Sequence, residues 1–530
     1  MSEPVGAAPV PRIRNHVGAL VLLLVVLSLV LDLDDSWTSD DGAYAGQSQA
    51  LIDGDGWAVP STLAGGDGVH SPWLNATSSS DGVYPYARHP GWPLLLSPFH
   101  RWGGPTGLHV IPLVSVVAAA AVAWYLARIR APGREPIAFW AVAFSPVLIN
   151  GFSLWAHAPS AALGGVALLA LNRITGGRFA RPWPFVLGLA LAVGVVLRSE
   201  GLLFAAVVTF ASVSSVAGNL AARARMAVVV AAPVAVAVVV ERAWVARIVG
   251  DPLAGDLAPR TGGSWIDGRV RAALELFLEP DLGRSGALLL LGVVGVALIV
   301  LIERRWAGPT ALAVVVGLAV VYCLRSVTGS AEPAPGLLVA WPLALAALLG
   351  LRGASLQTNR VLAGVIGGYV LLVLASQDPV GGGVEWGARF LSPVTVGIAV
   401  LAVGALGPTL VRGAGLVVIA AVIVLPTATG LALTERLRGT HESIRLDATA
   451  FPADVYVTGQ RALPRLAWGS EDARWLLAGP GELGVLLQRL EEAGVRRVAV
   501  QGFRESELPR GWVVDGDTGS TRLLVLESDS

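Results

Sequence analysis

The feature that most constrains this chain is the recurrence of apolar stretches through its first 433 residues. A hydrocarbon core about 30 Å thick needs roughly 20 apolar residues in a helix. Of the 530 residues, 54% are hydrophobic and only 14% are charged, which is typical of a polytopic membrane protein and not of a soluble one. We expect thirteen spans, at residues 15–32, 108–127, 137–150, 155–172, 183–198, 201–218, 226–243, 285–302, 309–325, 336–350, 360–376, 389–406 and 414–433.

Arginines between these spans predict the orientation. With the amino terminus in the cytoplasm, the short arginine-bearing loops share one face, at residues 128–135, 172–181, 222–225, 303–305, 352–360 and 412. The first span lacks a small-residue cleavage site, so we expect a retained anchor and not a signal peptide. The long segments then lie together outside: the first external loop 33–107, the third external loop 244–284, and residues 434–530. Long loops are uncommon unless they have a function, so the functional face is predicted to be extracytoplasmic.

Charge and residue usage exclude several function classes. The formal net charge is zero, so a basic surface for nucleic acid is not expected. All 38 basic residues are arginine, which excludes lysine nucleophiles and Schiff bases. The single cysteine, Cys323, cannot form an internal disulfide, and cysteine-based zinc binding is excluded as well.

The external segments have readable patterns of their own. Residues 265–278 have an amphipathic pattern that predicts an interfacial helix, with Arg269 and Arg271 toward the headgroups, and simple anchoring and a substrate role are both open. The tail alternates five strand-like segments with one amphipathic helix, residues 481–494, which predicts a small soluble α/β domain. We find no phosphate loop or catalytic cluster in this tail, so an accessory or docking role is favoured.

Ionisable residues gather at the external ends of the spans. They are Asp40 and Asp41, His89, His157, Arg198 with Glu200, Arg325, and Glu385 with Arg389. Such a set suits a reaction on a phosphate at headgroup level, because a carboxylate can take a proton from an attacking hydroxyl and arginines can neutralise the departing phosphate. Plainer interpretations stay open: a solvated acidic loop, interfacial arginines, a helix-end histidine at His157, and a salt bridge across four residues between Glu385 and Arg389.

The motifs and their order carry a resemblance. An amino-terminal span is followed by SDDGAYAGQSQALIDGDGW (39–57), then ARHPGWPLLLSPFH (87–100), LRSEGLLF (197–204) and WGARFLSPV (386–394). Over about 430 residues this resembles the GT-C superfamily of polyprenyl-phosphate-sugar-dependent glycosyltransferases, nearest to its protein O-mannosyltransferase and aminoarabinose-transferase branch. The tail lacks a WWDYG-like motif, which argues against transfer to peptide asparagine.

The resemblance implies roles for particular residues. The acid that opens the first external loop is the catalytic base, which corresponds to Asp40 or Asp41. The remaining matches and their neighbours are expected to bind substrate: Tyr86, Arg88, His89, His157, Arg198, Glu200, Glu385 and Arg389. No cofactor is required, although Asp40, Asp41 and His157 could together hold a divalent cation such as Mg²⁺ or Mn²⁺.

The resulting hypothesis is an inverting membrane glycosyltransferase. Its partners would be a polyprenyl-phosphate-linked sugar donor, membrane lipid, and a glycan, lipid or protein acceptor hydroxyl, with no nucleic acid. A lipid-linked saccharide or polysaccharide translocator is the alternative, and it would need a polar lane through the bundle to the inner face. An acyl- or phosphotransferase is a third possibility, but the seven histidines show no convincing spacing for it.

Overall fold

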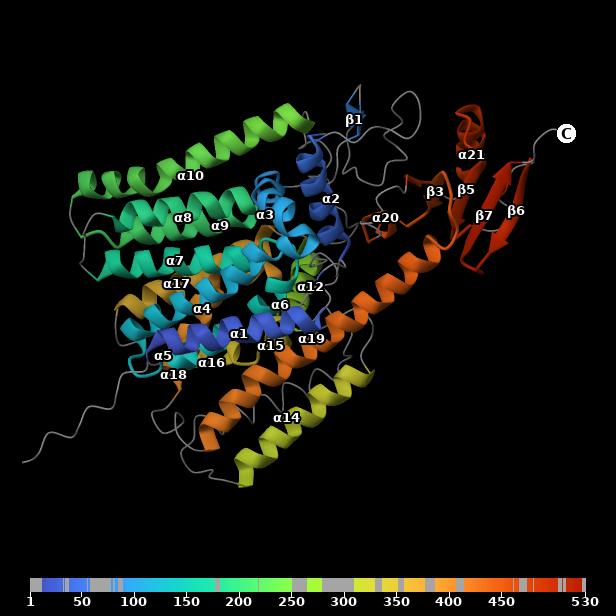
Figure 1. The fold of residues 1–530 in the computed structure, drawn as a ribbon. Helices are drawn as coiled ribbons and strands as arrows, with labels where there is room; N and C mark the ends of the chain where they lie inside the picture. Colours follow the sequence, from blue (N-terminus) through green and yellow to red (C-terminus); the bar gives the residue numbers. More distant parts are fainter. Residues whose placement is uncertain are drawn as a thin grey trace, which may run out of the picture.

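The chain forms a helical bundle that ends in a small β-sheet domain (Figure 1). The computed structural model describes residues 12–31, 33, 38–54, 56–57, 78–79, 82–83, 89–176, 182–217, 219–249, 265–278, 309–328, 336–350, 357–376, 387–406, 414–460, 462–466, 474–479, 481–503, 508 and 511–526. The predicted span 285–302 lies outside these residues, as do Tyr86, Arg88 and Glu385.

Helices fill the other twelve predicted spans. The first half of the bundle contains α1 (Ile13–Val30), α4 (Val110–Arg130), α5 (Glu135–Ala143), α6 (Pro146–Phe152), α7 (His157–Thr175), α8 (Trp183–Leu197), α9 (Glu200–Ser214) and α10 (Leu220–Val249). The second half contains α12 (Trp265–Phe277), α14 (Pro309–Thr328), α15 (Leu337–Ala340), α16 (Ala344–Gly350), α17 (Gln357–Ser376), the 3₁₀ helix η3 (Arg389–Val394), α18 (Thr395–Ala405) and α19 (Ala414–Ala448).

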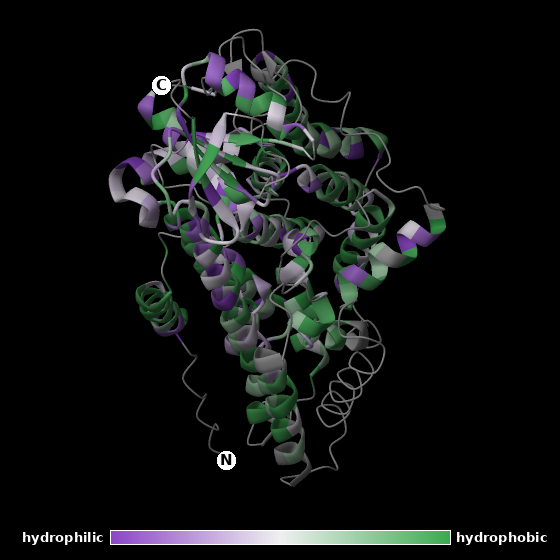
Figure 2. Ribbon diagram, turned by 90° about the vertical axis from the view of Figure 1, so that its right-hand side faces the viewer, coloured by the Kyte–Doolittle hydropathy of each residue, from purple (hydrophilic) through white to green (hydrophobic). Residues whose placement is uncertain are grey.

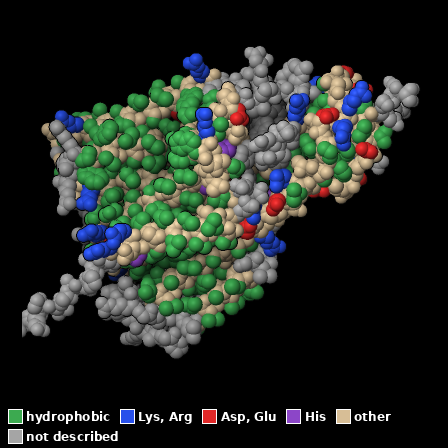
Figure 3. Space-filling view, viewed as in Figure 1, with side chains coloured by type: hydrophobic (Ala, Val, Ile, Leu, Met, Phe, Trp, Pro, Cys, Tyr) green, Lys and Arg blue, Asp and Glu red, His purple; other side chains and the backbone are tan. Residues whose placement is uncertain are grey.

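Within the described residues, five helices are long and apolar enough to cross a membrane: α1, α4, α10, α17 and α19. The pair α5 and α6 would make a sixth span, bent by 45° where Pro146 opens the second helix. The flank of the bundle is covered by apolar side chains, whereas charged side chains gather over the sheet domain (Figure 3). The ribbon coloured by hydropathy shows the same contrast (Figure 2). The chain is thus a multi-pass membrane protein with a small polar domain.

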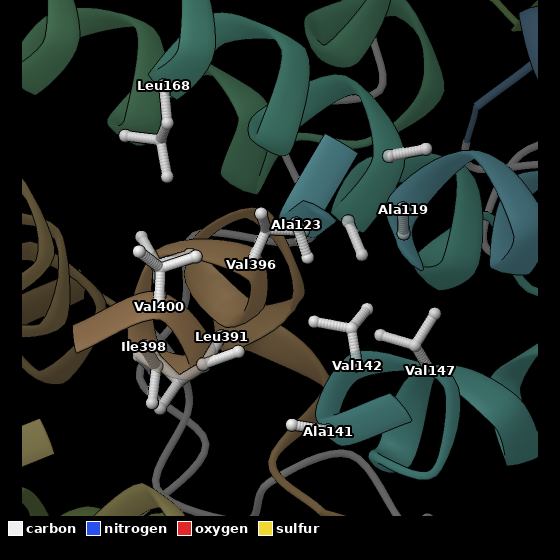
Figure 4. Close-up of a cluster of buried hydrophobic side chains, with 14 of the residues drawn as sticks. Ala119, Ala123, Ala141, Val142, Val147, Leu168, Leu391, Val396, Ile398 and Val400 are labelled. Atoms are coloured by element: carbon white, nitrogen blue, oxygen red, sulfur yellow. The ribbon is translucent and has the colours of Figure 1, made fainter. Parts of the chain in front are cut away.

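Small residues hold the centre of the bundle together. Alanines of α4 and α5 face valines and leucines of α18 and η3 in a fully buried cluster (Figure 4). Gly164 of α7 lies against the Pro393 carbonyl so closely that a Cβ would overlap it. Its neighbour Gly165 leaves room for Val396 in the same way. These glycines let η3 pack directly on α7.

Two helices occupy the segment that hydropathy marks as the first external loop. They are α2 (Ser39–Asp53) and α3 (Gly91–Gly107), and a short pair of strands, β1 (Ser78–Ser79) and β2 (Gly82–Val83), lies between them in the sequence. The helix α2 begins with a capping box and ends at Gly54, which has a left-handed backbone (φ 88°). It is polar yet largely buried, so an apolar pattern could not reveal it.

The tail forms the predicted sheet domain. Its strands are β3 (Val455–Thr458), β4 (Trp475–Leu477), β5 (Arg497–Gln501), β6 (Trp512–Asp517) and β7 (Thr521–Leu526), in the order β4-β3-β5-β7-β6. The first three strands are parallel and the last two form an antiparallel hairpin. The helix α21 (Leu483–Glu492) buries the predicted leucine face, residues 483, 486, 487 and 490, on one side of the sheet.

The sheet domain is joined to the bundle at two places. The helix α19 runs without a break past residue 433, where the sequence suggested a boundary, and continues to Ala448. There the Asp447 carboxylate accepts hydrogen bonds from the hydroxyls of Thr518, Ser520 and Thr521 in the β6–β7 hairpin. The short helix α20 (Leu463–Leu466) packs against α2. The domain therefore contacts the helix that carries Asp40 and Asp41.

Candidate active site

The amino-terminal turn of α2 holds Asp41 in a fixed position. Thr38 is the capping residue: its Oγ1 accepts from the Asp41 backbone N–H at 3.2 Å, and its own N–H donates to Asp41 Oδ2 at 2.9 Å. This reciprocal capping box satisfies two backbone donors at the helix start. Asp41 is 2% exposed, whereas Asp40 is only partly buried. The two adjacent acids therefore have different surroundings.

The turn between α6 and α7, residues 153–156, meets this helix end. The Leu154 N–H donates to Asp41 Oδ1 at 2.8 Å, so both carboxylate oxygens of Asp41 accept from backbone groups. The Leu154 carbonyl accepts from the indole N–H of Trp92, in the HPGW segment that opens α3. One turn thus fixes the starts of α2 and α3.

Trp155, in the same turn, connects three groups of the site. Its indole Nε1–H donates to Thr38 Oγ1 at 3.0 Å. The Arg389 guanidinium lies over its ring, 4.0 Å from the centroid. The ring of His157 lies 5.2 Å away, centroid to centroid. The sequence pattern predicted no role for Trp155, although it lies two positions before His157, a predicted site residue.

Arg389 is held by the backbone around it. It opens η3 directly after Gly387 and Ala388, which both have left-handed backbones (φ 80° and 55°). A left-handed alanine is uncommon and costs energy, which is typical of a functional turn. The hydroxyl of Tyr369, in α17, donates to the Phe390 carbonyl at 2.6 Å and fixes the next residue. Arg389 itself is buried, 8% exposed.

Arg198 and Glu200 form a buried ion pair at the hairpin between α8 and α9. Arg198 Nη2 and Nε donate to Glu200 Oε1 at 2.6 and 3.2 Å, and Nε also lies 3.1 Å from Oε2. Their side chains are 13% and 4% exposed. Gly201 allows the tight hairpin, because a Cβ there would overlap the Gly194 carbonyl. Arg198 also lies within electrostatic reach of Asp40.

His89 and His157 complete the group. His89 is buried at the start of α3, with Nδ1 3.7 Å from Glu241 Oε1 of α10. His157 is 1% exposed, and its Nε2 has no hydrogen-bond partner among the described residues. His157 lies close enough to His89, Arg198 and Arg389 to feel their charges. The structure therefore brings these predicted residues to one end of the bundle.

Burial controls the ionisation of Asp41. The helix α2 lies outside the candidate spans, and removal from water raises the pKa of Asp41 to about 7. Hydrogen bonds from Leu154 and Thr38 oppose this rise, and the nearby charge of Asp40 adds to it. Asp41 is thus partly protonated near neutral pH, and its burial and its two backbone hydrogen bonds make it less accessible to a substrate hydroxyl than Asp40.

The predicted metal site is not formed. In the part of the chain that the structure describes, no three His, Cys, Asp or Glu side chains are arranged to hold a metal ion. Asp40, Asp41 and His157 therefore do not form such a group in this structure.

The sequence missed Thr38, Leu154, Trp155 and Glu241. A Thr-x-x-Asp pattern before a helix could have indicated the cap. Glu241 is an acid near the end of an apolar stretch, which is by itself a sign of function. The other two act through contacts between elements far apart in the sequence, which no local pattern reveals.

Comparisons with known proteins place this fold. No family model and no curated protein matches the chain. It superimposes on the crystal structure of ArnT from Cupriavidus metallidurans bound to undecaprenyl phosphate with a TM-score of 0.52 and 11% identity, over 96% of this chain and 98% of that one. The apo state of ArnT gives a TM-score of 0.46 and 14% identity, over 96% and 98% of the two chains. An oligosaccharyltransferase from Archaeoglobus fulgidus, in complex with Zn and sulfate, gives 0.47 and 15%, over 91% of this chain and 67% of that one.

At these identities the likeness defines the fold. The chain is a multi-pass membrane protein with the fold of ArnT. The resemblance drawn from the sequence motifs is therefore confirmed for the fold, and with it the general architecture of a helical membrane bundle with a small carboxy-terminal sheet domain.

Proposed function

We propose that the protein is an inverting glycosyltransferase that moves a sugar from a polyprenyl-phosphate donor to an acceptor hydroxyl on the extracytoplasmic side. One observation carries the proposal: the turn at residues 153–156 joins the acid-bearing end of α2 to the Arg389 guanidinium, with the Arg198–Glu200 pair beside them. A proton acceptor and cationic groups around one position are what transfer from a phosphate donor requires. The bound undecaprenyl phosphate of the ArnT structure supports the lipid class of the donor.

Asp40 is the proposed base. It is the partly exposed member of the acidic pair, whereas Asp41 is buried and both of its oxygens accept backbone hydrogen bonds. In the proposed step the acceptor oxygen attacks the anomeric carbon, and its proton passes to Asp40. The bond between that carbon and the phosphate oxygen breaks, and the phosphate leaves as an anion that Arg389 and Arg198 stabilise. A single displacement inverts the anomeric configuration.

The arrangement of the core favours the enzyme over a translocator. Apolar side chains of α4, α5, α7 and α18 form a buried cluster within the described part of the bundle (Figure 4). A headgroup crossing there would lose its hydration without gaining polar partners. In the proposed topology the amino terminus is cytoplasmic, and the sheet domain lies outside, where α20 contacts α2.

The test is transfer by the purified full-length chain in lipid nanodiscs, with undecaprenyl-phosphate-linked sugars as donors. Asp40→Asn should lower turnover about 10²- to 10⁴-fold, the usual worth of a general base, with donor affinity retained. Asp53→Asn is the matched control, because Asp53 lies at the other end of the same helix and its carboxylate accepts hydrogen bonds from the Gln49 side-chain amide. Full activity in Asp40→Asn would remove the proposed base, and lack of undecaprenyl phosphate binding by the wild-type protein would remove the proposed function.

A further inference from the structure

The indole of Trp155 touches both halves of the proposed site with different parts of the same side chain. Its ring supports the Arg389 guanidinium at 4.0 Å, and its N–H donates to Thr38 at 3.0 Å. The ring is rigid, so the separation between these two contacts is set by the indole itself. Trp155 is 5% exposed, and its neighbour Leu154 is also bound to α2 through Asp41.

The contact with Arg389 concerns the phosphate half. A guanidinium over an aromatic face is attracted by the ring quadrupole, and the attraction grows where water is excluded. Arg389 is buried on this ring and also lies 5.1 Å from the ring of Phe390. The ring of Trp155 therefore fixes the plane of the group that is proposed to meet the donor phosphate.

The contact with Thr38 concerns the base half. Thr38 Oγ1 accepts both the indole N–H and the Asp41 backbone N–H, so Trp155 bonds to the atom that caps α2. Asp40 lies between Thr38 and Asp41 in this first helical turn. Any shift of the cap would move the Asp40 carboxylate relative to Arg389.

We infer that Trp155 is a positioning residue that holds the base of α2 and the phosphate-binding Arg389 at a fixed separation, with the N–H serving the base and the ring serving the donor. The inference rests on the proposed function for its catalytic meaning. It assigns a role to a side chain that itself needs no contact with substrate.

The experiment separates the two parts of the side chain in the full-length protein. Trp155→Phe keeps a ring under Arg389 and removes the N–H donor, whereas Trp155→Ala removes both. Trp140→Phe is the matched control, because it also removes an indole hydrogen bond, the one to His16 at 3.1 Å, in a part of the bundle away from the site. Turnover, KM for the lipid donor, and hydrogen exchange of residues 38–45 are measured for each variant.

In Trp155→Phe we expect kcat to fall about tenfold, as for one lost buried hydrogen bond, with KM for the donor unchanged and faster exchange in the first turn of α2. In Trp155→Ala we expect the same loss in kcat and, in addition, a KM about tenfold higher, because Arg389 loses its support. Trp140→Phe should match the wild type in all three measurements. Identical kinetics for Trp155→Phe and Trp155→Ala would overturn the division between ring and N–H.

A second set of variants tests the same bond from its acceptor. Thr38→Ser keeps the hydroxyl and should behave as the wild type, whereas Thr38→Val should be at least as impaired as Trp155→Phe. Adding Trp155→Phe to Thr38→Val should cost no more than about twofold, because a bond already lost cannot be lost again. Independent, multiplying effects would overturn the inference.

Failure of the inference can be told apart from failure of the proposed function. If the wild-type protein neither binds undecaprenyl phosphate nor transfers sugar from it, the proposed function fails. Hydrogen exchange still tests whether Trp155 holds the start of α2. Unchanged exchange at residues 38–45 in Trp155→Phe refutes this role, and faster exchange there supports it. If transfer is normal in the wild type and in Trp155→Phe alike, only the inference fails.

Discussion

We expect that replacing both members of the buried Arg198–Glu200 pair by uncharged residues preserves the stability of the fold but weakens binding of the lipid donor. Removing one partner strands the other charge in a site where both side chains are at least 87% buried, since their exposures are 13% and 4%. Breaking such a pair costs about 3–5 kcal/mol, whereas replacing both members by uncharged residues is often neutral. We therefore expect Glu200→Gln to cost about 3 kcal/mol, at the low end because Asp40 partly compensates the charge of Arg198. Arg198→Met should cost more, and the double variant should recover to within about 1 kcal/mol of the wild type.

The assay is the free energy of unfolding in mixed micelles, followed by binding of undecaprenyl phosphate to each folded variant. The control is Asp517→Asn, which breaks the Arg522–Asp517 pair of the sheet domain, where the two side chains are 21% and 42% exposed. This change should cost clearly less than Glu200→Gln, because both charges keep contact with water. If Arg198 binds the donor phosphate, the stable double variant should still lose affinity for the lipid by about tenfold or more. Wild-type affinity in the double variant would refute the phosphate role and leave a purely structural ion pair.

Two further predictions concern the surroundings of the site. The raised pKa of Asp41, about 7 against an ordinary 3.8, means that the folded state binds more protons than the unfolded state between these values. Protection of α2 from hydrogen exchange should then be full below about pH 4 and fall as the pH rises through 7, and an unchanged slope in Asp41→Asn would contradict this. Gly164→Val should push η3 away from α7 at the Pro393 carbonyl and weaken lipid binding through Arg389, whereas Gly367→Val, at a position with open space, should not. Equal lipid affinity in both glycine variants would show that η3 can shift without moving Arg389.

The sequence predicted the helices of the bundle well, because a helix that crosses a membrane needs a long run of apolar residues, which is easy to recognise in a sequence. Helices occupy every predicted span within the described residues, and all five strand segments of the tail form strands. Hydropathy fails to predict a helix whose buried side chains are polar. The helix α2 buries Gln47 and Ser48 along with Asp41, so hydropathy treats it as a loop although its cap and its terminal Gly54 are ordinary helix signals.

The sequence predicted only part of the site, and the reason is different. Residue types and their placement at span ends selected Arg198, Arg389 and His157, which the fold does bring together. The sequence could not tell which groups pair with which, because pairing depends on side-chain directions in the folded chain. Arg198 pairs with Glu200 two residues away only because its backbone is extended at the end of α8 (φ −157°), and Arg389 finds Trp155 from more than 200 residues away.

The distinction between Asp40 and Asp41 shows how much one local assignment can decide. As neighbours in a loop they would be equivalent, and either could be the base. Once Thr38 is recognised as the cap of a helix, Asp41 takes the third helical position, from which a side chain reaches back to the cap, and Asp40 takes the second. The Thr-x-x-Asp spacing was present in the sequence all along. What was missing was a reason to expect a helix there, and that reason is tertiary: the turn at Leu154 donates to Asp41, and α3 and α20 pack against this polar helix at the end of the membrane bundle.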